Sequence, residues 1–182
     1  AYDSSLWNAS GNATIGTEGT ALKLATNGNS ASSCRARATN FIVPIGHKIY
    51  IAGTVDASHL SASTASLRLY VGAGGGSSSG TGAIVVKAET AAQRYSVMAS
   101  TTESNVCLAC AIVSNAPTTD YALFKDVLCI DLTAMFGAGN EPSTVAEFET
   151  LYPESYYPYD AGSLLPVNMA GIATEDADGN PL

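Results

Sequence analysis

The stretch His47-Lys48-Ile49-Tyr50-Ile51-Ala52-Gly53-Thr54-Val55 decides the fold class of this chain of 182 residues. Branched apolar residues fall on one face of the stretch, at Ile49, Ile51 and Val55, and the residues between them include Lys48 and Thr54. Successive side chains of a β-strand point to opposite faces of a sheet. The alternation therefore predicts a strand that is buried on one side.

The same alternation recurs along the chain, between turns rich in Gly, Ser and Pro. Ser66 to Val71 places Leu67 and Leu69 on the inward face and Arg68 and Tyr70 on the outward face. Further strands are predicted over residues 40–43, 83–88, 94–99, 105–113 and 121–130, whereas the Gly/Ser-rich residues 72–82 predict a mobile loop. Short strands at this spacing, with no helix between them, predict an all-β fold: an antiparallel two-sheet β-sandwich (jelly roll) over about residues 20–130.

The pattern changes after Ile130. Leu132 to Phe136 predicts a short helix that ends at Gly137 in the left-handed conformation. A second helix is predicted with Pro142 in its first turn and a capping box from Thr144 to Glu147. An apolar stripe at helical spacing predicts that this helix lies against the sandwich; it comprises Val145, Phe148, Leu151 and Tyr152.

These patterns divide the chain into three expected parts. Residues 1–130 form the jelly-roll sandwich, residues 131–160 form a helical connector packed on it, and residues 161–182 form a linker or the start of a following module. Because the chain opens at Ala1, without Met or a secretory leader, we expect it to be part of a longer polypeptide.

The charges are sparse and unevenly spread. Up to Lys125 there are eight basic and six acidic residues, a net charge of +2, whereas residues 126–182 hold ten acidic residues and no Lys or Arg. Nucleic-acid binding requires clustered basic side chains against phosphate, so this acidic end predicts no nucleic-acid partner. No apolar run approaches about 20 residues, the length that spans a bilayer, so we expect no membrane insertion.

Cys107 and Cys110 have the C-x-x-C spacing that zinc and redox sites use. Residues 105–113 are predicted to form a strand, in which side chains three apart point to opposite faces. The two thiols then neither share a metal nor form a disulfide with each other. We expect Cys107, Cys110 and Cys129 to be free, mostly buried thiols, and we predict no metal site.

The segment Asp131-Leu132-Thr133-Ala134-Met135-Phe136-Gly137-Ala138-Gly139-Asn140-Glu141-Pro142 resembles a block that recurs in tail and fibre proteins of bacteriophages and prophages. There the block closes a β-sandwich of the carbohydrate-binding-module type. Three upstream segments resemble strands of the galactose-binding-like jelly rolls of phage structural proteins, with Ala92 where many members carry Trp: residues 43–53, 93–97 and 124–128.

This resemblance covers about residues 41–160 and implies a biological setting. It implies an extracellular virion module of a tail or fibre, whose partners are other tail or fibre modules or copies of itself, and a host-surface glycan. The alternative is a carbohydrate-binding module of a secreted bacterial enzyme or adhesin. A glycan-degrading depolymerase, a third class, requires a catalytic domain outside these residues.

Catalytic chemistry is poorly provided for, and we expect no enzyme activity and no catalytic residue. Gly76-Ser77-Ser78-Ser79-Gly80 matches the G-x-S-x-G pattern of serine hydrolases but lies in a low-complexity loop, without the strand-to-helix turn that the motif requires. No pair of carboxylates is spaced for glycoside hydrolysis. We expect no cofactor. Sandwich modules of this type often carry a structural calcium, but residues 176–180 lack the distal Glu of a calcium loop and are expected to form a plain turn.

Sugar binding requires aromatic faces for stacking and planar polar groups for hydroxyls on an exposed sheet face. Tyr70 beside Arg68 on an outward strand face meets that requirement, and Trp7 and Tyr121 are further candidates. The alternative interpretation is that these are ordinary surface residues of a sandwich, where outward Tyr and Arg are common.

Overall fold

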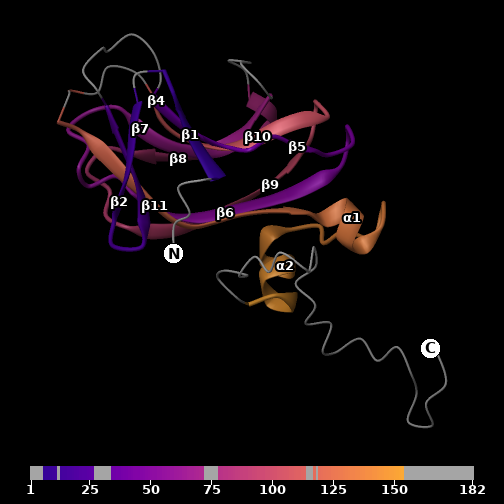
Figure 1. Ribbon diagram of the computed structural model, residues 1–182. Helices are drawn as coiled ribbons and strands as arrows, with labels where there is room; N and C mark the ends of the chain where they lie inside the picture. The colour runs from indigo at the N-terminus through magenta and orange to yellow at the C-terminus, as the bar shows by residue number, and fades with distance from the viewer. Residues whose placement is uncertain are drawn as a thin grey trace.

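Two antiparallel sheets face each other and form a β-sandwich (Figure 1). The computed structural model describes residues 6–11, 13–26, 34–71, 78–113, 117 and 119–153. The predicted fold class, an antiparallel two-sheet jelly roll with a short helical appendage, is confirmed. Neither helix of the described residues is long and apolar enough to cross a membrane.

The sheets have different strand orders, and we name them A and B. Sheet A runs in the order β1 (Trp7–Ser10), β4 (Cys34–Ala38), β10 (Asn105–Val113), β7 (Thr64–Val71) and β8 (Ser78–Lys87), and β5 (Phe41–Ile42) also pairs with β10. Sheet B runs in the order β2 (Ala13–Glu18), β3 (Ala21–Thr26), β11 (Tyr121–Asp131), β6 (Lys48–Asp56) and β9 (Gln93–Ser100).

The sandwich begins earlier than the predicted residue 20, because β1 and β2 already belong to it. The strand β8 likewise begins at Ser78, inside the stretch predicted to be a mobile loop; residues 72–77 of that stretch lie outside the described residues. Gly and Ser have little intrinsic preference for strands, but pairing with a neighbouring strand overrides it. Here Ser78 pairs with Tyr70 of β7.

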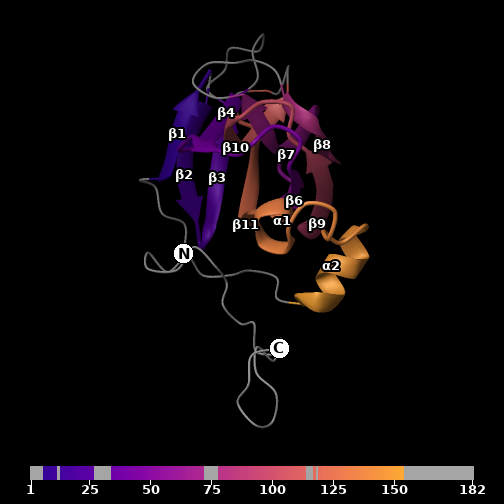
Figure 2. The same ribbon diagram turned by 90° about the vertical axis from the view of Figure 1, so that its right-hand side faces the viewer.

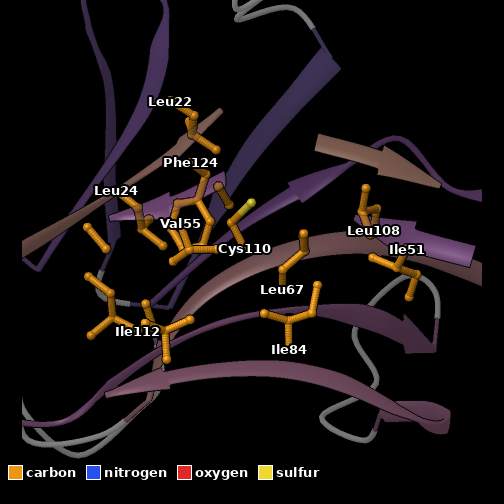
Figure 3. Close-up of a cluster of buried hydrophobic side chains, with 14 of the residues drawn as sticks. Leu22, Leu24, Ile51, Val55, Leu67, Ile84, Leu108, Cys110, Ile112 and Phe124 are labelled. Atoms are coloured by element: carbon orange, nitrogen blue, oxygen red, sulfur yellow. The ribbon is translucent and has the colours of Figure 1, made fainter. Parts of the chain in front are cut away.

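The core fills the space between the two sheets with branched and aromatic side chains (Figure 3). Sheet B contributes residues such as Leu22, Ile51, Val55 and Phe124, and sheet A contributes Leu67, Leu108, Cys110 and Ile112. The inward faces of β6 and β7 are therefore the ones predicted from their alternation.

A β-bulge interrupts the pairing of β11 with β6 between Lys125 and Leu128. Lys125 pairs with Thr54 and Leu128 pairs with Ala52, so that one residue of β6, Gly53, lies opposite two residues of β11. Asp126, in the bulge, has a positive φ of 51°. A Cβ at Gly53 would lie 2.9 Å from Leu67 Cδ2, so only glycine fits there without a shift.

The bulge reverses which side chains of β11 face the core. Before it, Phe124 belongs to the core between the sheets. After it, Val127 and Cys129 pack against that core, while Leu128 and Ile130 turn to the opposite face of sheet B. One extra residue exchanges the two faces of a strand, because side chains alternate with a period of two.

The helices α1 (Leu132–Phe136) and α2 (Val145–Leu151) cover part of that opposite face (Figure 1). Figure 2, turned by 90°, again shows them next to β6 and β9. Their second hydrophobic cluster is centred on Tyr50, Ala52, Leu132 and Phe148. The helical segment 131–153 is therefore packed on the outer face of sheet B, whereas the predicted part boundaries at 130 and 160 remain predictions.

Local details of α2 differ from the prediction in two respects. The N-cap is Thr144, whose side chain accepts from the N–H of Glu147, as the capping-box spacing predicts, but the Glu147 carboxylate accepts from the N–H of Ser143. Pro142 lies before the N-cap and not in the first turn.

Leu151 does not belong to the apolar stripe: it is 57% exposed, while Val145, Phe148 and Tyr152 pack on the sheet. At about 100° per residue, Leu151 lies about 120° from Val145 around the helix axis and turns away from the sheet.

Gly137 ends α1 with a positive φ, as predicted, but not in the left-handed helical region. Its φ of 86° is combined with a ψ of 149°, an extended conformation that glycine alone adopts readily. Its N–H donates to the carbonyl of Thr133 and closes the turn.

Candidate functional site

Four large side chains on the outer face of sheet A form the candidate site. Arg35 and Arg37 come from β4 and flank Ala36, which is buried in the core, so both arginines face outward. Arg68 and Tyr70 come from β7 and flank the buried Leu69 in the same way. We call Arg35, Arg37, Arg68 and Tyr70 the arginine face.

Small residues of β10 separate these side chains. Ala109 pairs with Arg37 on one side and with Arg68 on the other, so the two arginines lie two strand spacings apart, about 10 Å between backbones. Cys107, Ala109 and Ala111 are fully buried although they face outward. The long side chains beside them account for this burial, because arginine stems readily lie over apolar surface.

Tyr70 holds two of the guanidinium groups. The ring centroid lies 4.7 Å from Arg35 Cζ and 5.7 Å from Arg68 Cζ, within the range of cation–π attraction. Tyr70 is only 4% exposed. The structure thus brings Tyr70 and Arg68 together on the outward face, as the sequence predicts, but the ring lies against cations and does not present an open stacking surface.

The electrostatics of this face are one-sided. The six strands of sheet A contain Arg35, Arg37, Arg68 and Lys87 and no Asp or Glu, although the whole chain has a net charge of −8. Among the described residues, neither Arg35 nor Arg37 has a hydrogen bond or an ion pair with an acid. Burial raises the pKa of the Cys107 thiol, and the positive charges of Arg37 and Arg35 partly oppose that rise.

Three buried polar atoms of this face have no hydrogen-bond partner: Arg35 Nε, Ser66 Oγ and Ser10 Oγ. They lie in one row across the sheet, because Arg35 pairs with both Ser10 and Ala111, and Ala111 pairs with Ser66. Unpaired buried polar groups cost free energy, so their concentration in one row is unusual for a purely structural surface.

The other two predicted sugar-binding residues lie elsewhere. Trp7 of β1 is half-buried and packs against the core between the sheets. Tyr121 lies on β11 in sheet B, stacked on His59 with ring centroids 4.3 Å apart and with Lys23 Nζ 3.6 Å from its ring centroid. The four candidates are therefore divided among three places, and only Arg68 and Tyr70 lie together.

Sequence reasoning missed Arg35 and Arg37. The signal was present in Cys34-Arg35-Ala36-Arg37-Ala38, where arginine alternates with small residues at the period of a strand. The segment was not recognised as a strand, because Ala and Cys give weak apolar contrast against their neighbours.

The terminal block is a network of its own hydrogen bonds. The Asp131 carboxylate caps α1 through the N–H of Ala134 and lies 2.8 Å from His47 Nδ1. Thr133 Oγ1 accepts from the N–H of Lys48 and donates to Glu141, whose other carboxylate oxygen accepts from the N–H of Gly139. The polar residues of the block thus position the chain on β6.

A second polar chain fixes α2. The Tyr50 hydroxyl donates to Glu149 Oε1 at 2.7 Å, and Arg94 Nη2 lies 3.5 Å from the same hydroxyl. Burial, together with the bond to Glu149, raises the pKa of Tyr50. A phenol held neutral between a carboxylate and a helix is a structural link, and it shows no arrangement for catalysis.

The cysteines and the hydrolase-like motif offer no reactive centre. Cys110 packs in the core between the sheets and Cys107 lies on the outer face of sheet A, as their predicted strand requires. From Ser78 on, the G-x-S-x-G match lies in an extended strand. No cluster of three His, Cys, Asp or Glu in the described part of the chain is placed to hold a metal ion. The turn predicted at residues 176–180 lies outside the described residues.

Comparison with known proteins shows the fold. No protein-family model matches the chain, and no curated protein matches it. A solved CBM4 carbohydrate-binding module has a TM-score of 0.53 at 13% identity, over 69% of this chain and 94% of the module. An arabinose-bound GH51 α-L-arabinofuranosidase has the same TM-score at 10% identity, but the match spans only 23% of that enzyme. The structural neighbours are thus carbohydrate-binding modules with a β-sandwich fold.

Proposed function

We propose that this chain is a non-enzymatic structural and receptor-binding module of a phage tail or fibre protein, and that it binds glycans through the arginine face. The fold supports the glycan half of this proposal, because a solved carbohydrate-binding module shares it over nearly its whole length. The phage setting rests on the resemblance of residues 131–142 to the block found in tail and fibre proteins.

One observation carries the proposal: polar, planar groups and an aromatic ring are gathered on the outer face of the sheet opposite the helices. The outer face of sheet B is partly occupied by α1 and α2, whereas that of sheet A carries side chains with donors still to be paired. Guanidinium groups bind sugar oxygens through several donors in a fixed plane.

A glycan array on the purified protein tests the binding. We expect a restricted set of glycans to bind, and Arg68→Ala to abolish that binding while Tyr121→Ala, on the other sheet, retains it. Binding that is lost in Tyr121→Ala and kept in Arg68→Ala would move the site to sheet B. If no glycan bound at all, the glycan half of the proposal would be wrong.

The setting requires a separate test. Antibodies raised against the chain should label the tail or fibre of phage particles prepared from the source. The alternative, a carbohydrate-binding module of a secreted bacterial enzyme or adhesin, predicts instead that the chain is found in the secreted or cell-surface fraction and is absent from particles.

A further inference from the structure

We propose that the arginine face selects anionic glycans, in which carboxylate or sulfate groups on the sugar pair with Arg35, Arg37 and Arg68. This inference rests on the proposed glycan-binding function and adds the chemical class of the ligand. It follows from the charge of the face, from the spacing of its arginines and from the burial of its only aromatic ring.

The first argument is charge. Three guanidinium groups, which remain ionised at every physiological pH, lie on a face whose strands contain no acidic residue. Like charges at this spacing repel, and the fold gains nothing from their sign, because the stems alone cover Ala109 and Ala111. An anionic ligand supplies the opposite charge that the described residues do not provide for Arg35 and Arg37.

The second argument is geometry. Arg37 and Arg68 stand on either side of Ala109, about 10 Å apart at the backbone, with a floor of small side chains between them. Guanidinium groups bind carboxylates and sulfates with two parallel hydrogen bonds, which fixes orientation as well as adding energy. Two such groups across a flat floor suit anionic groups on successive units of a sugar chain.

The third argument is the state of Tyr70. A neutral sugar is held chiefly by stacking on an open aromatic face, but this ring is 4% exposed and lies against Arg35 and Arg68. Its position orients the cations, because attraction to the ring restricts where their planes can lie. Tyr70 is therefore a positioning residue, and recognition falls to the guanidinium groups.

The test compares matched polymers by isothermal titration calorimetry. Polygalacturonate and fully methyl-esterified polygalacturonate have the same backbone, but only the first carries carboxylates; dextran sulfate and dextran form the equivalent sulfate pair. We expect the charged member of at least one pair to bind, its neutral partner to bind at least tenfold more weakly, and the affinity to fall as salt is raised to about 0.5 M. The pair that responds identifies carboxylate or sulfate as the group recognised.

The variants separate the site from general charge. Arg37→Gln and Arg68→Gln should each weaken binding of the charged polymer about tenfold, as for one charge-assisted pair, and Lys125→Gln on sheet B should not. Arg37→Lys keeps the charge but loses the fork, so it should also weaken binding. Melting curves by circular dichroism identify any variant that fails to fold, in which case the remaining variants decide.

Three results would overturn the inference. Equal binding of the charged and neutral polymers would leave glycan binding intact but remove the selection for anions. Equal binding of a single-stranded oligonucleotide of the same charge would show attraction to any polyanion. Binding of neutral glycans alone on the array would likewise contradict the anion selection without contradicting the proposed function, which fails only if nothing on the array binds.

Discussion

Replacement of Phe148 by Ala tests whether the terminal helices are part of the folding unit. Phe148 is 1% exposed, and its ring centroid lies 4.6 Å from that of Tyr50 and 5.2 Å from that of Tyr152. Deleting a buried aromatic side chain costs about 3–5 kcal/mol. Because Tyr152 and Phe136 are only partly buried and can shift into the space, we expect a loss of about 3 kcal/mol in the free energy of unfolding.

Urea and thermal unfolding, followed by circular dichroism, measure this loss. For a chain of this size, about 3 kcal/mol lowers the melting temperature by roughly 6–12 °C. The control is Leu151→Ala in the same helix, which should change the free energy of unfolding by less than about 0.5 kcal/mol because Leu151 is exposed. An unchanged melting temperature in Phe148→Ala would refute the reasoning, since α2 would then detach without unfolding the sandwich. Glycan affinity of the folded variant should be unchanged.

Three further predictions concern stability and reactivity. Gly53→Ala should destabilise the fold by about 1–3 kcal/mol in urea unfolding, because the new methyl group would lie 2.9 Å from Leu67; a neutral effect would mean that the bulge yields. The hydrogen bond from Thr133 lowers the pKa of Glu141 from its usual 4.5, so its carboxylate adds stability at neutral pH that is lost as pH falls below that value; the stability gap between wild type and Glu141→Gln, measured from pH 7 to pH 3, should therefore shrink on acidification. Burial raises the pKa of Cys129 to about 12, so at pH 8 only about one thiol in ten thousand is ionised; mass spectrometry should show iodoacetamide labelling only after unfolding.

The sequence predicts the strands that carry strong apolar contrast. Residues 105–113 were predicted to be a strand and are β10, with the same bounds. The alternation in β6 and β7 also assigns their core-facing side chains correctly. Where small or polar residues form the strand, as in β1, β2 and β4, periodicity gives no signal, because pairing with neighbours and not side-chain burial decides their conformation.

The candidate site was predicted in part for a related reason. Arg68 and Tyr70 alternate with leucines, so their outward direction can be read from the chain. That Arg35, distant in sequence, reaches the same tyrosine depends on β10 lying between β4 and β7. Strand order is a property of the whole fold, which local patterns do not specify, and the burial of Tyr70 follows from the same arrangement.

The bulge in β11 has a consequence for how this module can be recombined with others. The residues upstream of it are constrained by the opposing sheet, whereas Leu128 and Ile130 downstream are constrained by the helices. A transplant of the terminal block onto another sandwich that began at Asp131 would leave behind half of its docking surface. The smallest transferable cassette therefore starts at Lys125, and a deletion of one residue there would turn Leu128 and Ile130 inward and detach the block from its own module.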